Sequence, residues 1–144
     1  MSSIGDPLVI GLDSSTQSCK AIAWDRSGNA VAEGRAPLEL ARPRPDFAEQ
    51  EAGDWWQAAT IALRQVTAAV DPKRIAGLAI SNQRETVALV DAEGNAIGPA
   101  SVWLDERAAG LVDRFAGEFG RQRLHEITGK PIDVTPVVYR LKWL

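Results

Sequence analysis

Apolar residues change their spacing at Asp54, and this change constrains the fold more than any other feature of the sequence. Before Asp54, short apolar runs at residues 8–12 and 20–24 flank a polar stretch, and residues 30–35 follow a turn. Runs of this length are typical of strands, so we expect an antiparallel meander. After Asp54 the apolar residues recur at helical spacing: Trp55, Ala58, Ala59, Ala62, Leu63 and Val66. The chain therefore begins as strands and continues into an amphipathic helix.

Capping and turn residues predict where the other elements begin and end. Asp54 is the expected N-cap of the helix, which should end before Asp71 because Pro72 disfavours helical backbone in its predecessor. Two turns share the pattern Asp-x-x-Gly-Asn, at 25–29 and 91–95. Further strands are predicted at 75–80, which should be buried, at 86–90 and at 99–103, and helices at 106–119, 121–127 and from 137 onward. This order favours an α/β fold.

Composition excludes several classes of protein. A chain of 144 residues with 45% hydrophobic residues is the size of one globular domain. A net charge of -3 argues against a nucleic-acid partner, because proteins bind nucleic acid through a basic face. We expect a cytoplasmic protein without a membrane partner, since no apolar run is long enough to span a bilayer and residues 1–7 do not resemble a leader. The single cysteine, Cys19, excludes an internal disulfide.

The polar stretch after the first predicted strand is the first candidate for chemistry. Asp13 ends the apolar run, and ligands of open α/β sheets collect at the carboxyl ends of strands. A tight turn could cradle phosphate oxygens, while Asp13 could hold Mg²⁺ and Lys20 could balance phosphate charge. A plain polar hairpin with local hydrogen bonds explains the same residues, and the spacing leaves both readings open.

Two later segments carry further polar groups. In residues 81–86, Arg84 offers five donors and Glu85 offers acceptors, so together they could grip neighbouring hydroxyls of a polyol; a solvated turn is the alternative. Trp103 could form an apolar wall against a sugar or simply pack in the core. Asp105 is expected to cap the helix that follows it.

Four segments, taken in order, resemble the start of the FGGY carbohydrate kinases, the family of glycerol, xylulose and gluconate kinases. DSSTQSCKA at 13–21 is similar to the family's phosphate turn in its xylulose-kinase form, and ISNQRET at 80–86 to the segment whose Arg and Glu bind glycerol. PASVWLDERA at 99–108 resembles the Trp-containing substrate segment, and FAEQEAGDWWQA at 47–58 the acidic loop and first helix.

The resemblance implies a ribonuclease H-like (actin-like ATPase) α/β fold, with a mixed sheet and flanking helices. Residues 1–144 would form the front part of the N-terminal, sugar-binding domain, with the C-terminal ATP-binding domain absent. The implied activity is phosphorylation of a sugar or polyol hydroxyl with ATP and Mg²⁺. The family's catalytic Asp lies beyond residue 144, so the resemblance implies no catalytic residue in this chain, which alone should be inactive.

The resemblance also assigns site residues. Asp13 would bind the metal, and the phosphate-binding residues would be Asp13, Ser14, Ser15, Thr16, Gln17, Ser18 and Lys20. The substrate-binding residues would be Gln83, Arg84, Glu85, Trp103 and Asp105.

Two departures from the family pattern bear on substrate and backbone. Ser15 stands where many members have Gly, so the turn either avoids positive φ or is strained. Thr135 stands where glycerol kinases place a substrate-facing Tyr, so a ketopentose such as xylulose is as compatible as a glycerol-like polyol.

Two rival functions and the oligomeric state remain to be tested. A ribonuclease H-like, metal-dependent nuclease would use Asp13 with Glu85 or Asp105 as metal ligands. A non-catalytic module would dock a partner through the large apolar residues among 141–144. The sequence leaves a homo-oligomer open.

Overall fold

The computed structural model describes residues 5–144, which form two compact units. The first unit comprises the residues up to Glu39 and the segment Ala52–Gln83; the second comprises Leu40–Glu51 and Arg84–Leu144. The expectation about a leader falls partly on residues 1–4, which lie outside the described residues. Among the described residues, no helix has both the length and the apolarity needed to cross a membrane.

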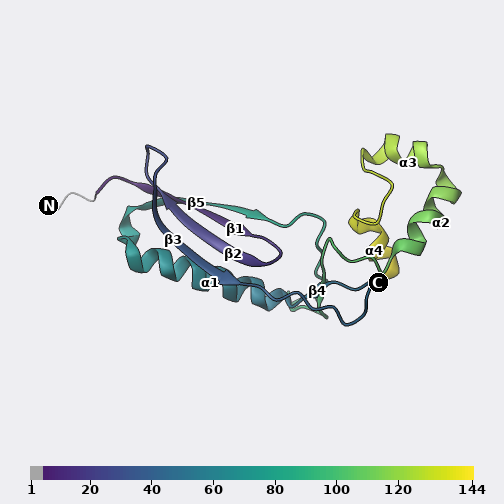
Figure 1. Cartoon of the computed structure of the whole chain (residues 1–144), viewed down its shortest axis with the longest axis horizontal. Coiled ribbons are helices and arrows are strands. Elements are labelled where there is room, and N and C mark those ends of the chain that lie inside the picture. The colour runs from purple at the N-terminus through teal and green to yellow at the C-terminus, as the bar shows by residue number, and fades with distance from the viewer. Residues whose placement is uncertain (1–4) are drawn as a thin grey trace. The chain divides into compact units, whose positions relative to one another are not determined.

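A four-stranded mixed sheet and one long helix form the first unit (Figure 1). The strand order is β3-β2-β1-β5, antiparallel across the first two pairings and parallel between β1 and β5. Helix α1 provides the crossover that the parallel pairing requires. The elements are β1 (Leu8–Ser14), β2 (Ser18–Trp24), β3 (Ala30–Pro37), α1 (Ala52–Ala69), the 3-10 turn η1 (Pro72–Arg74) and β5 (Ile75–Asn82).

The core of this unit lies between α1 and one face of the sheet. Strand residues of alternating position, among them Ile10 and Ala21, are buried there against the predicted apolar stripe of the helix. Gly34 marks the closest approach, because a Cβ built on it would overlap the carbonyl oxygen of Ala62 and lie 2.9 Å from Cβ of Gln65. The apolar face predicted for the helix is therefore confirmed.

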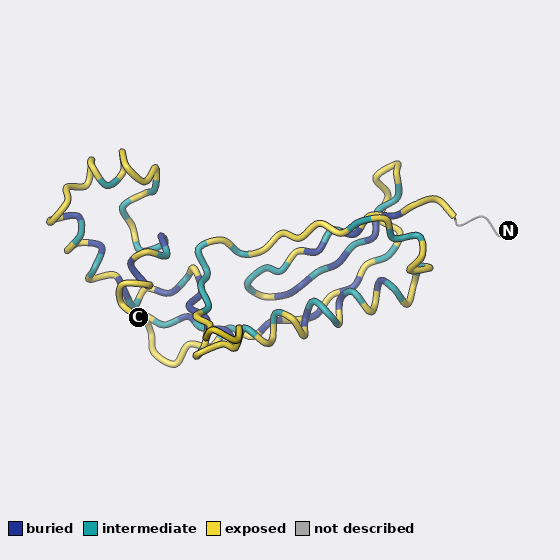
Figure 2. The backbone as a smooth tube through the Cα atoms, turned by 180° about the vertical axis from the view of Figure 1, so that it is seen from behind, coloured by how far each residue is buried: buried dark blue, intermediate teal, exposed yellow. Residues whose placement is uncertain are grey.

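Two details differ from the sequence predictions. The helix begins at Ala52, so Asp54 lies in its first turn and is not the N-cap. Strand β5 is mostly exposed, although its apolar run predicted burial (Figure 2). Leu78 and Ile80 share the helix-facing side of the sheet with Ile10 and Leu12, but α1 packs mainly over β2 and β3 and leaves β5 uncovered.

The second unit contains a two-stranded ladder and three helices. Residues 86–90 do not form the predicted strand; they make only isolated bridges, at Val87 with Ser101 and at Val90 with Ala96. A small core gathers around Val112 and Tyr139. The elements are β4 (Glu49–Gln50), β6 (Ala100–Ser101), α2 (Ala109–Phe119), α3 (Arg121–Thr128) and α4 (Val137–Trp143).

The two Asp-x-x-Gly-Asn turns have the same geometry. Asp25 Oδ1 accepts from the backbone N–H groups of Ser27 and Asn29, at 2.8 and 2.9 Å. Asp91 Oδ1 accepts from the corresponding groups of Glu93 and Asn95, at 3.1 and 2.7 Å. Both predicted turns are confirmed, because each depends only on local backbone chemistry.

Candidate functional site

A row of polar side chains crosses the face of the first unit's sheet that α1 does not cover. Asp13 on β1 is in register with Lys20 on β2 and with Ser81 on β5, and Lys20 is in register with Arg35 on β3. Neighbouring positions such as Leu12 and Cys19 are buried on the helix side, so the row faces the other way. The strand order thus sets one exposed carboxylate next to Lys20, with Arg35 one strand farther away.

The turn that joins β1 to β2 is held at both ends. The N–H and the hydroxyl of Ser15 donate to the carbonyl of Ser18, at 3.0 and 2.9 Å. The hydroxyl of Thr16 donates to Oε1 of Gln83 at 3.1 Å, and the N–H of Gln83 donates to the carbonyl of Ser14 at 3.1 Å. Ser15 does not adopt positive φ, since Glu85 is the one non-glycine residue with positive φ among residues 5–144. The turn is therefore unstrained at Ser15.

Charged groups around the turn already interact with one another. Nζ of Lys20 lies 3.1 Å from Oε1 of Glu33, and both side chains are well exposed to solvent. Nε of Arg35 donates to the hydroxyl of Ser18 at 3.1 Å. Burial and the charge of Asp13 raise the pKa of the Cys19 thiol, so this cysteine is protonated at neutral pH.

Glu85 is held by residues of the second unit that are distant in sequence. Its backbone has φ 58°, in the left-handed region. Its carboxylate accepts from Nζ of Lys130 and, at 2.9 Å, from the N–H of Val137, and its carbonyl accepts from the guanidinium of Arg140. Hydrogen bonds from Lys130 and Val137 hold the pKa of Glu85 below its usual range, and the charge of neighbouring Arg84 adds to this effect.

Asp105 is a buried structural carboxylate in the second unit. It accepts from the N–H of Ala48 at 2.7 Å and from Nε and Nη2 of Arg107 at 2.8 and 2.7 Å. Burial opposes ionisation of Asp105, but the hydrogen bonds from Arg107 and Ala48 outweigh it and lower the pKa. Helix α2 begins at Ala109, so the predicted capping role of Asp105 is wrong.

Arg107 completes this cluster. Its Nη2 lies 2.6 Å from Oε1 of Glu49, and its guanidinium lies 3.8 Å from the centre of the Phe47 ring. Nearby in sequence, Trp103 is 41% exposed, and its backbone N–H donates to the hydroxyl of Thr86 at 3.2 Å. Trp103 is thus partly exposed, whereas Asp105 is fully buried.

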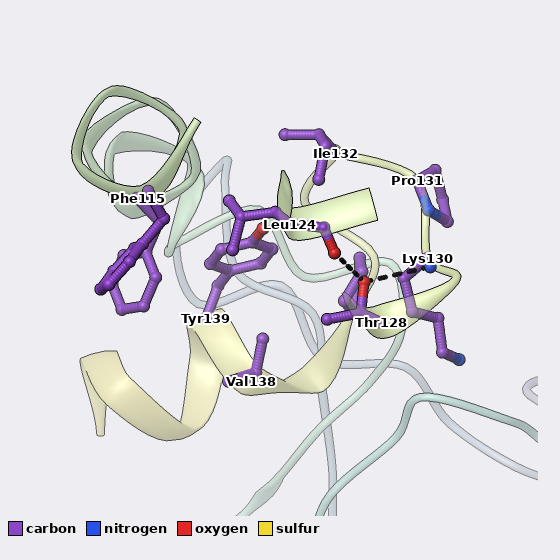
Figure 3. Close-up of a pocket in the computed structure, with 10 residues that line it drawn as sticks. Phe115, Leu124, Thr128, Lys130, Pro131, Ile132, Val138 and Tyr139 are labelled. Carbon is purple, nitrogen blue, oxygen red and sulfur yellow. Dashed lines mark hydrogen bonds between the residues drawn. The ribbon is translucent and has the colours of Figure 1, made fainter. Parts of the chain in front are cut away.

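An apolar cavity of about 270 Å³ lies among α2, α3 and α4 of the second unit (Figure 3). Phe115, Leu124, Ile132 and Tyr139 line it, and the hydroxyl of Thr128 at its edge bonds to the carbonyl of Leu124 at 2.7 Å. Figure 3 shows the side chain of Lys130 extending away from Leu124 and Tyr139. A cavity so poor in polar groups does not suit a polyol, which needs hydrogen-bond partners.

Two of the three carboxylates named for a nuclease, Glu85 and Asp105, are bound by other groups of the chain. Asp105 is bonded to Arg107 and Ala48, and Glu85 to Lys130 and Val137. Within the part of the chain that the structure describes, no three His, Cys, Asp or Glu side chains are grouped so that they could hold a metal ion. This arrangement does not support a two-metal nuclease.

Comparison with known proteins gives the family. The sequence profile of the FGGY family of carbohydrate kinases, N-terminal domain, matches residues 8–144. The chain belongs to the FGGY family of carbohydrate kinases. The FGGY chain is 33% identical over 144 residues to the glycerol kinase of Ligilactobacillus salivarius (strain UCC118), covering 98% of this chain and 29% of that protein. It is 34% identical over 139 residues to the glycerol kinase of Natranaerobius thermophilus, covering 94% of this chain and 28% of that protein.

Solved structures of two sugar kinases share its fold. The gluconate kinase from Lactobacillus acidophilus matches 96% of the FGGY chain and 28% of its own, with a TM-score of 0.89 at 23% identity. The xylulose kinase from Rhodospirillum rubrum matches 94% of the FGGY chain over 28% of its own length, with a TM-score of 0.89 at 26% identity. The expected mixed sheet with flanking helices is thereby confirmed. The FGGY chain spans about 29% of the length of the first of these relatives.

The FGGY chain divides its predicted site residues between its two units. The first unit holds the turn 13–18 with Lys20 and brings Gln83 to Thr16; Arg84, Glu85, Trp103 and Asp105 belong to the second. Sequence reasoning missed three neighbours of these residues, Arg35, Lys130 and Arg140, and did not place Ser81 beside Asp13. Strand alternation could have placed Arg35 and Ser81 on the face of Asp13, but nothing in the sequence links Lys130 or Arg140 to Glu85.

Proposed function

We propose that the protein carrying this chain transfers the γ-phosphoryl group of ATP to a hydroxyl of a small sugar or polyol. The observation that carries the proposal is the strand register that sets Asp13 opposite Lys20, beside a hydroxyl-rich turn, in a chain of the FGGY family. An exposed carboxylate next to an ammonium suits a phosphate bound with a divalent cation. The relatives named above are glycerol, xylulose and gluconate kinases, which supports the acceptor class.

The first unit would bind the phosphates of ATP. Mg²⁺, when bound, would neutralise phosphate charge, and Asp13 fits as its carboxylate ligand because it is exposed at the end of β1. Lys20 would exchange its exposed partner Glu33 for a phosphate oxygen at little cost, since surface ion pairs are weak. The turn would present Ser14, Ser15, Thr16, Gln17 and Ser18 to the phosphates. The hydroxyls of Ser15 and Thr16 would exchange their bonds to Ser18 and Gln83 for phosphate oxygens.

The second unit would bind the acceptor. Arg84 would donate to its oxygens, and the ionised carboxylate of Glu85 would accept from its hydroxyls. The exposed ring of Trp103 would cover its carbon-bound hydrogens. Asp105 would support the acceptor segment through Arg107. Gln83, which Thr16 anchors in the first unit, is the remaining candidate for the acceptor. A ketopentose such as xylulose and a glycerol-like polyol are the acceptors to test.

We propose that the general base and most of the ATP site lie outside these 144 residues. The carboxylates of the acceptor segment do not suit the base: Glu85 and Asp105 have lowered pKa values and are bound to basic groups. The chain by itself would then bind ligands without turning over. Reconstitution of activity would require the remainder of the protein.

An ATP-consumption assay of the whole protein tests this function. Xylulose, glycerol and gluconate are supplied in turn, and ADP release that depends on one of them is the expected result. Arg84→Ala should raise the acceptor KM about tenfold or more, because a hydrogen bond to a charged group is lost. Arg114→Ala, an exposed helix residue, is the matched control. Silence with every acceptor, or Mg²⁺-dependent cleavage of a nucleic acid instead, would overturn the proposal.

A further inference from the structure

Glu85 has a backbone conformation that its residue type disfavours. A φ of 58° places an L-residue in the left-handed region, where its Cβ crowds the following carbonyl. Such residues persist where the surrounding structure holds them, and they concentrate at functional sites.

Arg140 holds its main chain. This arginine is 0% exposed, lies on α4 and donates to the carbonyl of Glu85, which is 55 residues earlier. A second donor lies 3.4 Å from the carbonyl of Val134. Its buried Nε has no hydrogen-bond partner among the described residues. The hydrogen bond to Glu85 therefore offsets much of the free-energy cost of burying the guanidinium. A buried arginine that donates to a backbone carbonyl fixes the conformation of that residue.

Lys130 and the start of α4 hold the carboxylate. Nζ of Lys130 bonds to Oε1 of Glu85, and the N–H of Val137 bonds to Oε2 at 2.9 Å. With one donor on each oxygen, the plane of the carboxylate is fixed, while each oxygen keeps a lone pair for another donor. The charged groups facing Glu85 are Lys130, Arg84 and Arg140, all basic, so they favour the ionised form.

We propose that Lys130 and Arg140 are positioning residues for the acceptor, which hold Glu85 so that its carboxylate receives a sugar hydroxyl. The inference rests on the proposed kinase function and adds two residues to it. Lys130 is 44% exposed on its side chain, so it can be replaced without opening the core, whereas Arg140 is buried. The two residues therefore call for different substitutions.

The test uses the whole protein with Lys130→Met and Arg140→Lys. Lys142→Met and Arg123→Lys, both at exposed helix positions, are the matched controls. Lys130→Met should raise the acceptor KM about tenfold and leave the KM for ATP within about twofold, because one charge-assisted hydrogen bond to Glu85 is lost. Since Lys130 keeps the pKa of Glu85 low, its loss should move the acid limb of kcat/KM for the acceptor to higher pH.

A second readout does not depend on turnover. Hydrogen exchange of peptides covering residues 84–90 and 136–140 should be faster in both variants than in the controls, because Glu85 and the N–H of Val137 lose their constraint. Arg140→Lys keeps the positive charge, so this variant should fold. Its acceptor KM should rise less than that of Lys130→Met if the lysine ammonium still reaches the carbonyl of Glu85.

The outcomes separate the two proposals. Absence of turnover by the unsubstituted protein would overturn the kinase function itself. Turnover with Lys130→Met behaving as Lys142→Met in KM, pH profile and exchange would overturn the positioning role alone. A raised acceptor KM with unchanged exchange would also overturn it, since Lys130 would then contact the acceptor directly.

Discussion

The hydroxyl of Thr16 donates a hydrogen bond to the side-chain oxygen of Gln83, at 3.1 Å and across 67 residues of sequence. Thr16 lies in the turn after β1, and Gln83 directly follows β5. The N–H of Gln83 also bonds to the carbonyl of Ser14, so the parallel ladder extends to this point. The contact joins the predicted phosphate turn to the segment that leads into the predicted acceptor residues.

A double-mutant cycle should detect this contact. Thr16→Val and Gln83→Leu, singly and together, should show a coupling of about 0.5 to 1.5 kcal/mol in the free energy of unfolding, the range of a partly buried hydrogen bond. Urea unfolding of the whole protein, followed by tryptophan fluorescence, measures it. Pairing Thr16→Val with Gln57→Leu on the exposed side of α1 should give additive effects. Additivity in both pairs would mean that the contact contributes nothing.

Ser15→Gly should destabilise the turn. Ser15 does not use positive φ, and its side chain bonds to the carbonyl of Ser18 at 2.9 Å. Glycine would lose that bond and give the unfolded chain more freedom, at about 1 kcal/mol in the free energy of unfolding. Urea unfolding is the measurement, and a stabilised variant would show that the backbone at Ser15 is strained after all.

Gly34→Ala should separate α1 from β3. The added Cβ would overlap the carbonyl of Ala62, which is backbone and has little room to move. We expect a loss of about 2 to 3 kcal/mol in the free energy of unfolding, as for other overpacked sites. Gly77→Ala on β5 is the control, because nothing lies within 4 Å of its Cβ. Equal effects of the two substitutions would contradict the close approach.

Asp105→Asn should destabilise the second unit by about 1.5 to 3 kcal/mol at neutral pH, because it weakens the buried hydrogen bonds to Arg107, which keeps Glu49 as its other charged partner. Asp113→Asn, whose carboxylate is 82% exposed, should change little.

The effect of Asp105→Asn should depend on pH. The folded pKa of Asp105 is lowered, so its contribution is full above the unfolded value of about 4 and is lost as pH falls through the lower, folded value. The stability difference between Asp105→Asn and the unsubstituted protein should therefore shrink in acid. Urea unfolding at neutral pH and below pH 4 or so measures this. A difference that stays constant or grows in acid would show that Asp105 is not ionised in the folded state.

Local chemistry made part of this protein predictable from sequence. The turns at Asp25 and Asp91 follow from side chains that bond to backbone two and four residues on. The buried stripe of α1 follows from helical periodicity, and the strands β1 to β3 from short apolar runs. The polar turn at 13–18 was located for the same reason, since it interrupts those runs.

Packing alone decided which residues from distant parts of the sequence lie next to one another. The apolar run of β5 predicted burial, yet Leu78 and Ile80 are 50% and 66% exposed because α1 crosses over β2 and β3 instead. Asp105 has the sequence context of a helix cap, but its partners include the N–H of Ala48, 57 residues earlier. Sequence thus determined which segments form strands, turns and helices, through interactions within a few residues. Only the tertiary structure bound Glu85 to Lys130 and Arg140, because that arrangement depends on how α4 packs.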